Sequence, residues 1–134
     1  MTSETNRKIV EEIYAAFTQG DIDTVLEQFA DEGVWIYTMP DGSVPFAGTF
    51  EGKSRIAEWF RLFGSSVQTT SFQTKCLLFD GDDTVVALGH EDGRIIENGK
   101  TYSTDWVHVF HLKAGKVVKF IEYVDVSSVL ASFA

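Results

Sequence analysis

Residues 104–125, TDWVHVFHLKAGKVVKFIEYVD, decide the fold, because two segments with alternating apolar residues are joined there by the short link KAGK. Alternation with a period of two is typical of strands that bury one face. A short link that contains glycine between two such segments predicts an antiparallel hairpin. The inward faces are predicted to carry Thr104, Trp106, His108, Phe110 and Leu112 on the first strand and Val118, Phe120, Glu122 and Val124 on the second.

The same period of two continues over most of the second half of the chain. It predicts strands at residues 67–79, 84–97, 100–112 and 116–126, separated by the turn sequences DGDD, ENGK and KAGK. Strands joined consecutively in this way form an antiparallel meander. A sheet of this size with one apolar face needs a layer of helices to cover that face.

The first half of the chain supplies that layer. Apolar residues recur at helical spacing over residues 4–19, and a second helix is predicted to begin after an N-cap at Asp21 and to include Phe29. A short strand at 34–38 and a loop at 39–48 follow, and a third helix opens near Ser54 and ends near Gly64. The fold class is therefore α+β, with the sheet wrapped by three helices. Residues 127–133 predict a short closing helix, with Asp125 as its N-cap.

Length and charge limit the classes of protein to which the chain can belong. Its 134 residues suit a single domain, 1–134, and its 20 acidic and 11 basic side chains give a net charge of −9. Such a charge repels phosphate and anionic lipid, so neither nucleic acid nor a membrane is expected as a partner. With no signal-like segment and a single cysteine, we expect a cytoplasmic protein. Cys76 is interpreted as a small buried hydrophobe.

Glu122 and His108 are the predicted catalytic residues. A carboxylate among aromatic rings loses hydration, so its pKa rises toward neutrality, where a general acid or base works best. His108, on the adjacent strand, can pair with it. The alternative is that the two side chains only satisfy each other inside the sheet. The residues predicted to bind substrate are Tyr14, Trp35, Tyr37, Phe46, Trp59, Phe63, His90, Trp106 and Phe110.

His90 is included because alternation places it with Leu88 and Asp92, and that face is interpreted as looking into the same cavity. The Tyr14 hydroxyl is interpreted as an oxyanion donor at the cavity mouth, and the alternative is that Tyr14 only packs in the core, as most aromatic residues on amphipathic helices do. A metal site would have to be built from His90, His108 and Glu122 across strands, and the chain has neither HxH nor HxxxH spacing nor a cysteine cluster that would support one. We therefore expect no metal and no cofactor.

Three strings resemble the superfamily of nuclear transport factor 2 and ketosteroid isomerase, and within it the SnoaL-like polyketide cyclase branch. They are YAAFTQGDIDTVLEQFADEGVWI, PFAGTFEGKSRIAEWF and VHVFHLKAGKVVKFIEYVD. The resemblance covers nearly the whole chain. It implies a cone-shaped curved sheet, an apolar cavity and a homodimer formed through the outer sheet face. The chain departs from the isomerase branch because Trp35 and Tyr37 stand on the first long strand, where a carboxylate base is expected.

The resemblance implies one of two functions. The first is a cofactor-independent enzyme of the cyclase, isomerase or dehydratase type, acting by acid/base chemistry on a hydrophobic substrate that carries a carbonyl group. The second is a non-catalytic domain that binds a small hydrophobic ligand or serves in dimerisation.

Overall fold

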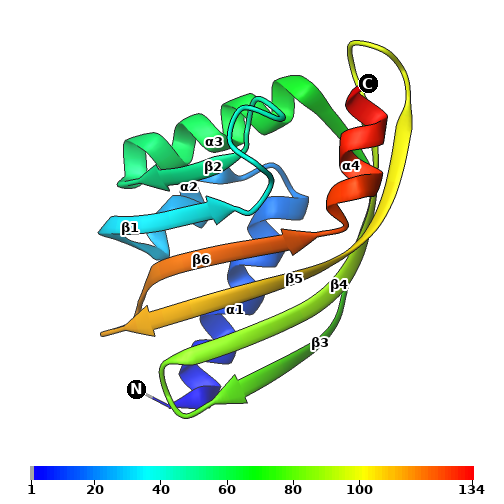
Figure 1. Cartoon of the computed structure of the whole chain (residues 1–134). Coiled ribbons are helices and arrows are strands. Elements are labelled where there is room, and N and C mark those ends of the chain that lie inside the picture. Colours follow the sequence, from blue (N-terminus) through cyan, green and yellow to red (C-terminus); the bar gives the residue numbers. More distant parts are fainter. Residues whose placement is uncertain (1) are drawn as a thin grey trace.

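The computed structural model describes residues 2–134, which form a curved sheet with helices on one side (Figure 1). In chain order the elements are α1 (Ser3–Thr18), α2 (Ile22–Glu27), β1 (Phe29–Tyr37), β2 (Gly48–Glu51), α3 (Lys53–Ser66), β3 (Val67–Asp80), β4 (Thr84–Ile95), β5 (Thr101–Lys113), β6 (Lys116–Val124) and α4 (Val126–Phe133).

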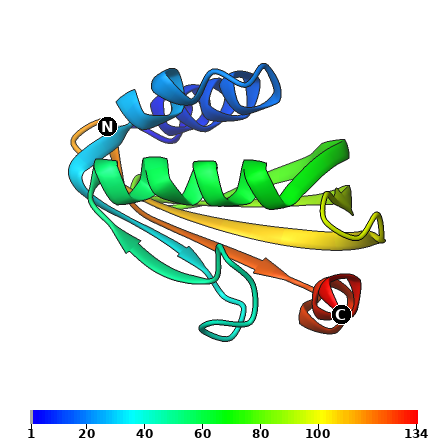
Figure 2. The same cartoon turned by 90° about the horizontal axis from the view of Figure 1, so that it is seen from above.

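The sheet has six strands in the order β2-β1-β6-β5-β4-β3. The predicted meander is confirmed, since β3 to β6 pair consecutively and antiparallel. Beyond β6 the strand pairing changes, because β1 lies parallel to β6 and antiparallel to β2. Seen from above, α1, α2 and α3 lie on one side of the sheet, and α4 lies at one end of it (Figure 2). The α+β class is therefore confirmed.

The helices form where the caps and apolar stripes predicted them. On α1, Ile9, Val10 and Ile13 are buried on one face, and the Asp21 carboxylate accepts a hydrogen bond from the Thr24 N–H at the start of α2. Between these two helices Gly20 adopts a φ of 74°, a conformation that glycine tolerates best. The short linker therefore folds the two helices into a hairpin over the sheet.

One prediction about the segment after α2 is wrong, and one strand there was not predicted. Phe29 does not belong to the second helix; it is the first residue of β1 and is completely buried. The sheet draws it in because Phe29 pairs with Val117 of β6, ahead of a register shift between Phe29 and Val34. The loop predicted at 39–48 is present, and it leads into the unpredicted strand β2, whose Phe50 pairs with Trp35.

Cys76 was predicted to be buried, and it is exposed. It lies on β3, which forms the edge of the sheet. A register shift between Thr74 and Cys76 interrupts the alternation there, and β3 is exposed over residues 73–76. Alternation predicts a buried face only where a second layer covers the strand, and this edge lacks such cover.

The inward face of β5 is confirmed as predicted, with Trp106, His108 and Phe110 all buried. On β6, Phe120 and Glu122 also face inward, but the buried residue nearer the turn is Val117 and not Val118. The reason is a register shift between His111 and Leu112, which pairs Leu112 with Val117.

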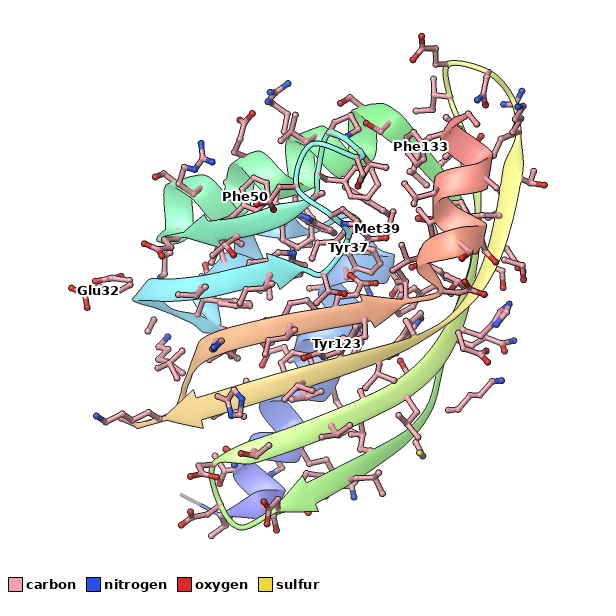
Figure 3. All side chains as sticks on the ribbon, in the orientation of Figure 1. Glu32, Tyr37, Met39, Phe50, Tyr123 and Phe133 are labelled. Atoms are coloured by element: carbon pink, nitrogen blue, oxygen red, sulfur yellow. The ribbon has the colours of Figure 1, made fainter. Side chains whose placement is uncertain are left out.

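Helix α4 closes one end of the structure. Asp125 is its N-cap, as predicted, and accepts a hydrogen bond from the Ser128 N–H. The Phe133 ring lies 5.9 Å from the Phe46 ring. Tyr37 and Met39 lie at the end of β1 nearer α4, whereas Glu32 lies at its opposite end (Figure 3).

Candidate functional site

A small cavity lies between the helices and the inner face of the sheet. Its volume is about 30 Å³, room for about two water molecules. Most of its wall is aromatic, and the polar residues that contribute to it are Glu91, His108 and Glu122, together with the Tyr14 hydroxyl. The cavity is thus an apolar chamber in which a few polar groups converge, the usual arrangement of a small-molecule site.

His108 and Glu122 meet because the β5–β6 hairpin places them directly opposite each other. Their side chains are almost completely buried, with 4% and 5% of each residue exposed. The His108 Nε2 atom lies 3.2 Å from the Glu122 Oε2 atom. This distance suits an ion pair. The angle between the two groups does not suit a hydrogen bond, however, and within residues 2–134 the Nε2 atom has no hydrogen-bond partner. A small rotation of either side chain, or a ligand oxygen, can satisfy the nitrogen.

Tyr14 of α1 completes the group from the helical layer. Its hydroxyl lies 2.7 Å from the Nδ1 atom of His108, and the two rings are nearly parallel. Burial, with a smaller contribution from the charge of Glu122, raises the pKa of Tyr14 well above its usual value, so the phenol keeps its proton. We assign the hydroxyl as the donor to Nδ1, which leaves the proton of a neutral imidazole on Nε2, facing Glu122.

Burial acts on the two catalytic candidates in opposite directions. It lowers the pKa of His108 well below its usual range and raises the pKa of Glu122 to about 8, while a hydrogen bond from Glu91 opposes that rise. Both shifts favour the uncharged form, because desolvation penalises whichever form carries charge. Near neutral pH the pair is therefore a neutral imidazole beside a carboxyl group that titrates within the physiological range.

Glu91 of β4 is a site residue that sequence reasoning missed. It is 3% exposed and accepts a hydrogen bond of 3.2 Å from the Tyr102 hydroxyl. Its carboxyl group is also hydrogen bonded to that of Glu122, and burial followed by the charge of Glu122 raises the pKa of Glu91 to about 8. Two carboxyl groups in contact cannot easily ionise together, so the pair holds a shared proton.

Glu91 faces the cavity because the inward residues of β4 are the odd-numbered ones. Gly89 and Gly93 flank it on the same face, and a Cβ atom at Gly89 would meet the Trp106 ring at 2.1 Å. A Cβ atom at Gly93 would likewise meet the Tyr102 ring at 2.5 Å. The sequence did contain a signal for Glu91. Val85 and Ala87 are apolar, and continuing their alternation by steps of two leads through Gly89 to Glu91.

His90 was predicted to face the cavity, and this is wrong. It lies on the outer face of the sheet, where its Nδ1 atom is 2.8 Å from Asp105 and its Nε2 atom is 3.2 Å from Asp92 and 2.8 Å from Ser103. Hydrogen bonds to these two carboxylates raise the pKa of His90. The metal site considered from His90, His108 and Glu122 cannot form, because His90 is separated from the other two by the sheet.

The other predicted substrate-binding residues fall into two groups. Those that line the cavity are Tyr14, Trp35, Trp59, Phe63 and Phe110. The remaining three lie behind its wall: Trp106 stacks on His108 with ring centroids 3.9 Å apart, and Tyr37 and Phe46 pack against each other at 5.0 Å. Trp106 and the Tyr37–Phe46 pair therefore support the wall.

None of the helices within residues 2–134 is long and apolar enough to cross a bilayer. Within the same residues, no three side chains of His, Cys, Asp or Glu gather in a metal-binding cluster.

A sequence profile of the SnoaL-like domain family matches residues 10–120 of the chain. Among curated proteins, the uncharacterised protein YesE of Bacillus subtilis (strain 168) is 25% identical over 122 residues, which cover 90% of this chain and 78% of YesE.

Solved structures agree with this family. An NTF2-like protein of Burkholderia thailandensis E264 is 27% identical, with a TM-score of 0.84 and 95% of each chain covered. TerC, co-crystallised with polyporic acid, is 21% identical, with a TM-score of 0.85 over 96% of this chain and 97% of TerC. Further neighbours have a ketosteroid isomerase-like fold or are described as an isomerase or a SnoaL-like polyketide cyclase. The predicted fold and family are thereby confirmed.

Proposed function

Because the chain belongs to the SnoaL-like domain family, we propose that its buried polar group performs acid/base catalysis on a small hydrophobic substrate with a carbonyl group. The observation that carries this proposal is the chain of contacts from Tyr14 through His108 to Glu122, with distances of 2.7 Å and 3.2 Å, inside an aromatic cavity. The reaction class is isomerisation, cyclisation or dehydration without a cofactor.

In the proposed reaction, the Glu122 carboxylate removes a proton from the carbon next to the substrate carbonyl. The electron pair of the broken C–H bond moves toward the carbonyl oxygen, which accepts a hydrogen bond from Nε2–H of His108. Tyr14 holds the imidazole in this tautomer through Nδ1. Glu122 then returns its proton to a different carbon, so that the enzyme ends in its starting state.

Glu91 has a supporting role in the same step. When Glu122 is the carboxylate of the pair, the shared proton resides on Glu91, and the hydrogen bond between them stabilises the anion. The Tyr102 hydroxyl donates a hydrogen bond to Glu91 and holds it in place. Because both pKa values are raised to about 8, the pair loses its first proton as the pH approaches about 8, and it then supplies one carboxylate and one protonated carboxyl group.

A non-catalytic binding domain is the second candidate. It is favoured by the volume of the cavity, about 30 Å³, which is filled by its own aromatic wall and admits a substrate only if side chains move. Such a domain would keep the same buried group for packing alone. The two candidates differ in whether a C–H bond of a bound ketone is broken.

The test is deuterium exchange into aromatic ketones such as 2-tetralone in D₂O, followed by mass spectrometry. We expect the wild-type protein to accelerate exchange at the carbon next to the carbonyl group. Glu122→Gln should reduce the acceleration by about a hundredfold or more, the usual contribution of a positioned base. Glu58→Gln, on the exposed face of α3 and paired with Arg61, is the matched control and should keep the wild-type rate.

Quenching of the fluorescence of Trp35 and Trp59, which line the cavity, reports binding independently of exchange. Ketones that bind without accelerated exchange would support the non-catalytic domain and overturn the proposal. Full exchange by a folded Glu122→Gln variant would remove Glu122 from the role of base.

A further inference from the structure

A second, larger hollow lies beside the inner cavity. We call it the outer groove; it lies between the α1–α2 linker, the C-terminal half of α3 and the start of β3, and its volume is about 470 Å³. Drug-sized ligands occupy pockets of about 300–1,000 Å³. The inner cavity is too small to hold such a molecule, whereas the outer groove is large enough.

Four phenylalanines line both the outer groove and the inner cavity and so form the wall between them: Phe17, Phe60, Phe63 and Phe72. Phe17 and Phe72 are half-buried and meet edge to face with ring centroids 5.1 Å apart. Phe72 also stacks at 5.0 Å on Trp106, which in turn stacks on His108. Stacked rings thus lead from the outer groove to the catalytic candidates. Phe17 and Phe72 are partly exposed, whereas Phe60 and Phe63 are buried, so Phe17 and Phe72 are the rings of this wall that can turn aside most readily.

The lining of the outer groove is uncharged. Among its described residues, the polar side chains are hydroxyl groups only, from Thr18, Thr69, Thr70 and Ser71. The absence of a Lys or Arg partner argues against a phosphate or carboxylate ligand, and the net charge of −9 repels anions further. Aromatic walls with a hydroxyl rim suit a flat neutral ring system.

We propose that the outer groove binds the body of a neutral, flat aromatic molecule, whose oxygenated end passes between Phe17 and Phe72 to His108 and Glu122. The role of that end rests on the proposed function; binding of the body does not. Reaction and recognition are then separated in space. The polar end of the ligand occupies the room that about two water molecules would fill, and the apolar rings stay outside the wall.

The probes are N-phenyl-1-naphthylamine, which is neutral and fluoresces in apolar sites, and 8-anilinonaphthalene-1-sulfonate, which has the same ring system and a negative charge. We expect saturable binding of the neutral probe with one site per chain. The sulfonate should bind more weakly than the neutral probe by a factor of about ten or more. Equal affinities, or no saturable binding of the neutral probe, would overturn the proposal.

Gly64 offers a variant that blocks the outer groove. It lines the groove one helical turn after Phe60, and a Cβ atom there would have no neighbour within 4 Å. Gly64→Leu fills the groove and should weaken binding of the neutral probe by about tenfold or more. Gly64→Ala, the matched control, leaves most of the volume free and should bind like the wild type. If Gly64→Leu binds like Gly64→Ala, the probe sits elsewhere and the proposal fails.

Glu122→Gln separates this inference from the proposed function. The substitution lies in the inner cavity and should leave binding of the neutral probe unchanged. If the probe binds in the outer groove while no ketone exchanges, the binding site stands and the catalytic proposal fails. If exchange occurs and Gly64→Leu affects neither exchange nor probe binding, the catalytic proposal stands and the groove is refuted.

Discussion

The buried carboxyl pair predicts that the free energy of unfolding falls as the pH rises through neutrality. Burial raises the pKa of Glu91 and of Glu122 to about 8 in the folded protein, from an ordinary value of 4.5. A group whose pKa is higher in the folded state stabilises that state fully below the unfolded pKa. This stabilisation is lost as the pH rises through the folded pKa.

Each proton that the folded state holds and the unfolded state releases contributes about 1.4 kcal/mol per pH unit. Between about pH 6.5 and about pH 8, one such proton corresponds to a loss of about 2 kcal/mol and two protons to about 4 kcal/mol. Below about pH 6.5, the unfolded chain protonates His108, whose pKa burial lowers in the folded state. This opposes the carboxyl effect, so stability should be greatest between about pH 4.5 and 6.5.

The assay is urea unfolding at several pH values and a fixed protein concentration, followed by tryptophan fluorescence. The double variant Glu91→Gln/Glu122→Gln carries no titrating group at the pair and should lose most of the decline between about pH 6.5 and 8. Glu58→Gln is the control and should keep it. His90 acts in the same direction, because Asp105 and Asp92 raise its pKa. Its exposure weakens the effect, and His90→Asn measures that share.

If the double variant keeps the full wild-type decline between about pH 6.5 and 8, the buried pair does not hold the proton and the reasoning about Glu91 is wrong. A wild-type curve without a decline refutes it equally.

Three further predictions follow from single contacts. Tyr14→Phe leaves the Nδ1 atom of buried His108 without its partner. It should lower the free energy of unfolding in urea by about 1–3 kcal/mol and slow ketone exchange. Unchanged stability and exchange would contradict the tautomer assignment. Gly89→Ala drives a Cβ atom into the Trp106 ring and should destabilise by about 3 kcal/mol or more, a loss that calorimetry would detect and whose absence would contradict the close approach. The homodimer predicted through the outer sheet face should weaken in Tyr123→Lys, since this exposed aromatic residue lies on β6. Sedimentation equilibrium at several concentrations should then show the variant as a monomer. A monomeric wild-type protein would refute the dimer.

Much of the fold was predictable because its patterns are local. The β5–β6 hairpin closes over the short link KAGK, so alternation alone placed His108 opposite Glu122. Caps at Asp21 and Asp125 act on amide groups within three residues. Such interactions depend on neighbours in the chain, which a sequence displays directly.

The errors came where a pattern was ambiguous or depended on distant partners. In LGHEDG, Gly89 and Gly93 carry no side chain to mark the inward face, so the alternation was assigned with His90 inward and Glu91 was missed. The inward face of β4 is determined by the rings of Trp106 and Tyr102, which occupy the space over the two glycines. The prediction that Cys76 is buried was wrong for a similar reason, since its burial depends on whether another layer covers the edge strand.

The sequence by itself determined the α+β class, the meander and the inward position of Glu122, because period and turn chemistry act over a few residues. Only the tertiary structure decided how the site is completed. Tyr14 reaches His108 across 94 residues of chain, and Glu91 meets Glu122 from a strand that is not its neighbour in the sheet. Their electrostatic consequences depend on burial, which arises only when helices and sheet close over these groups together.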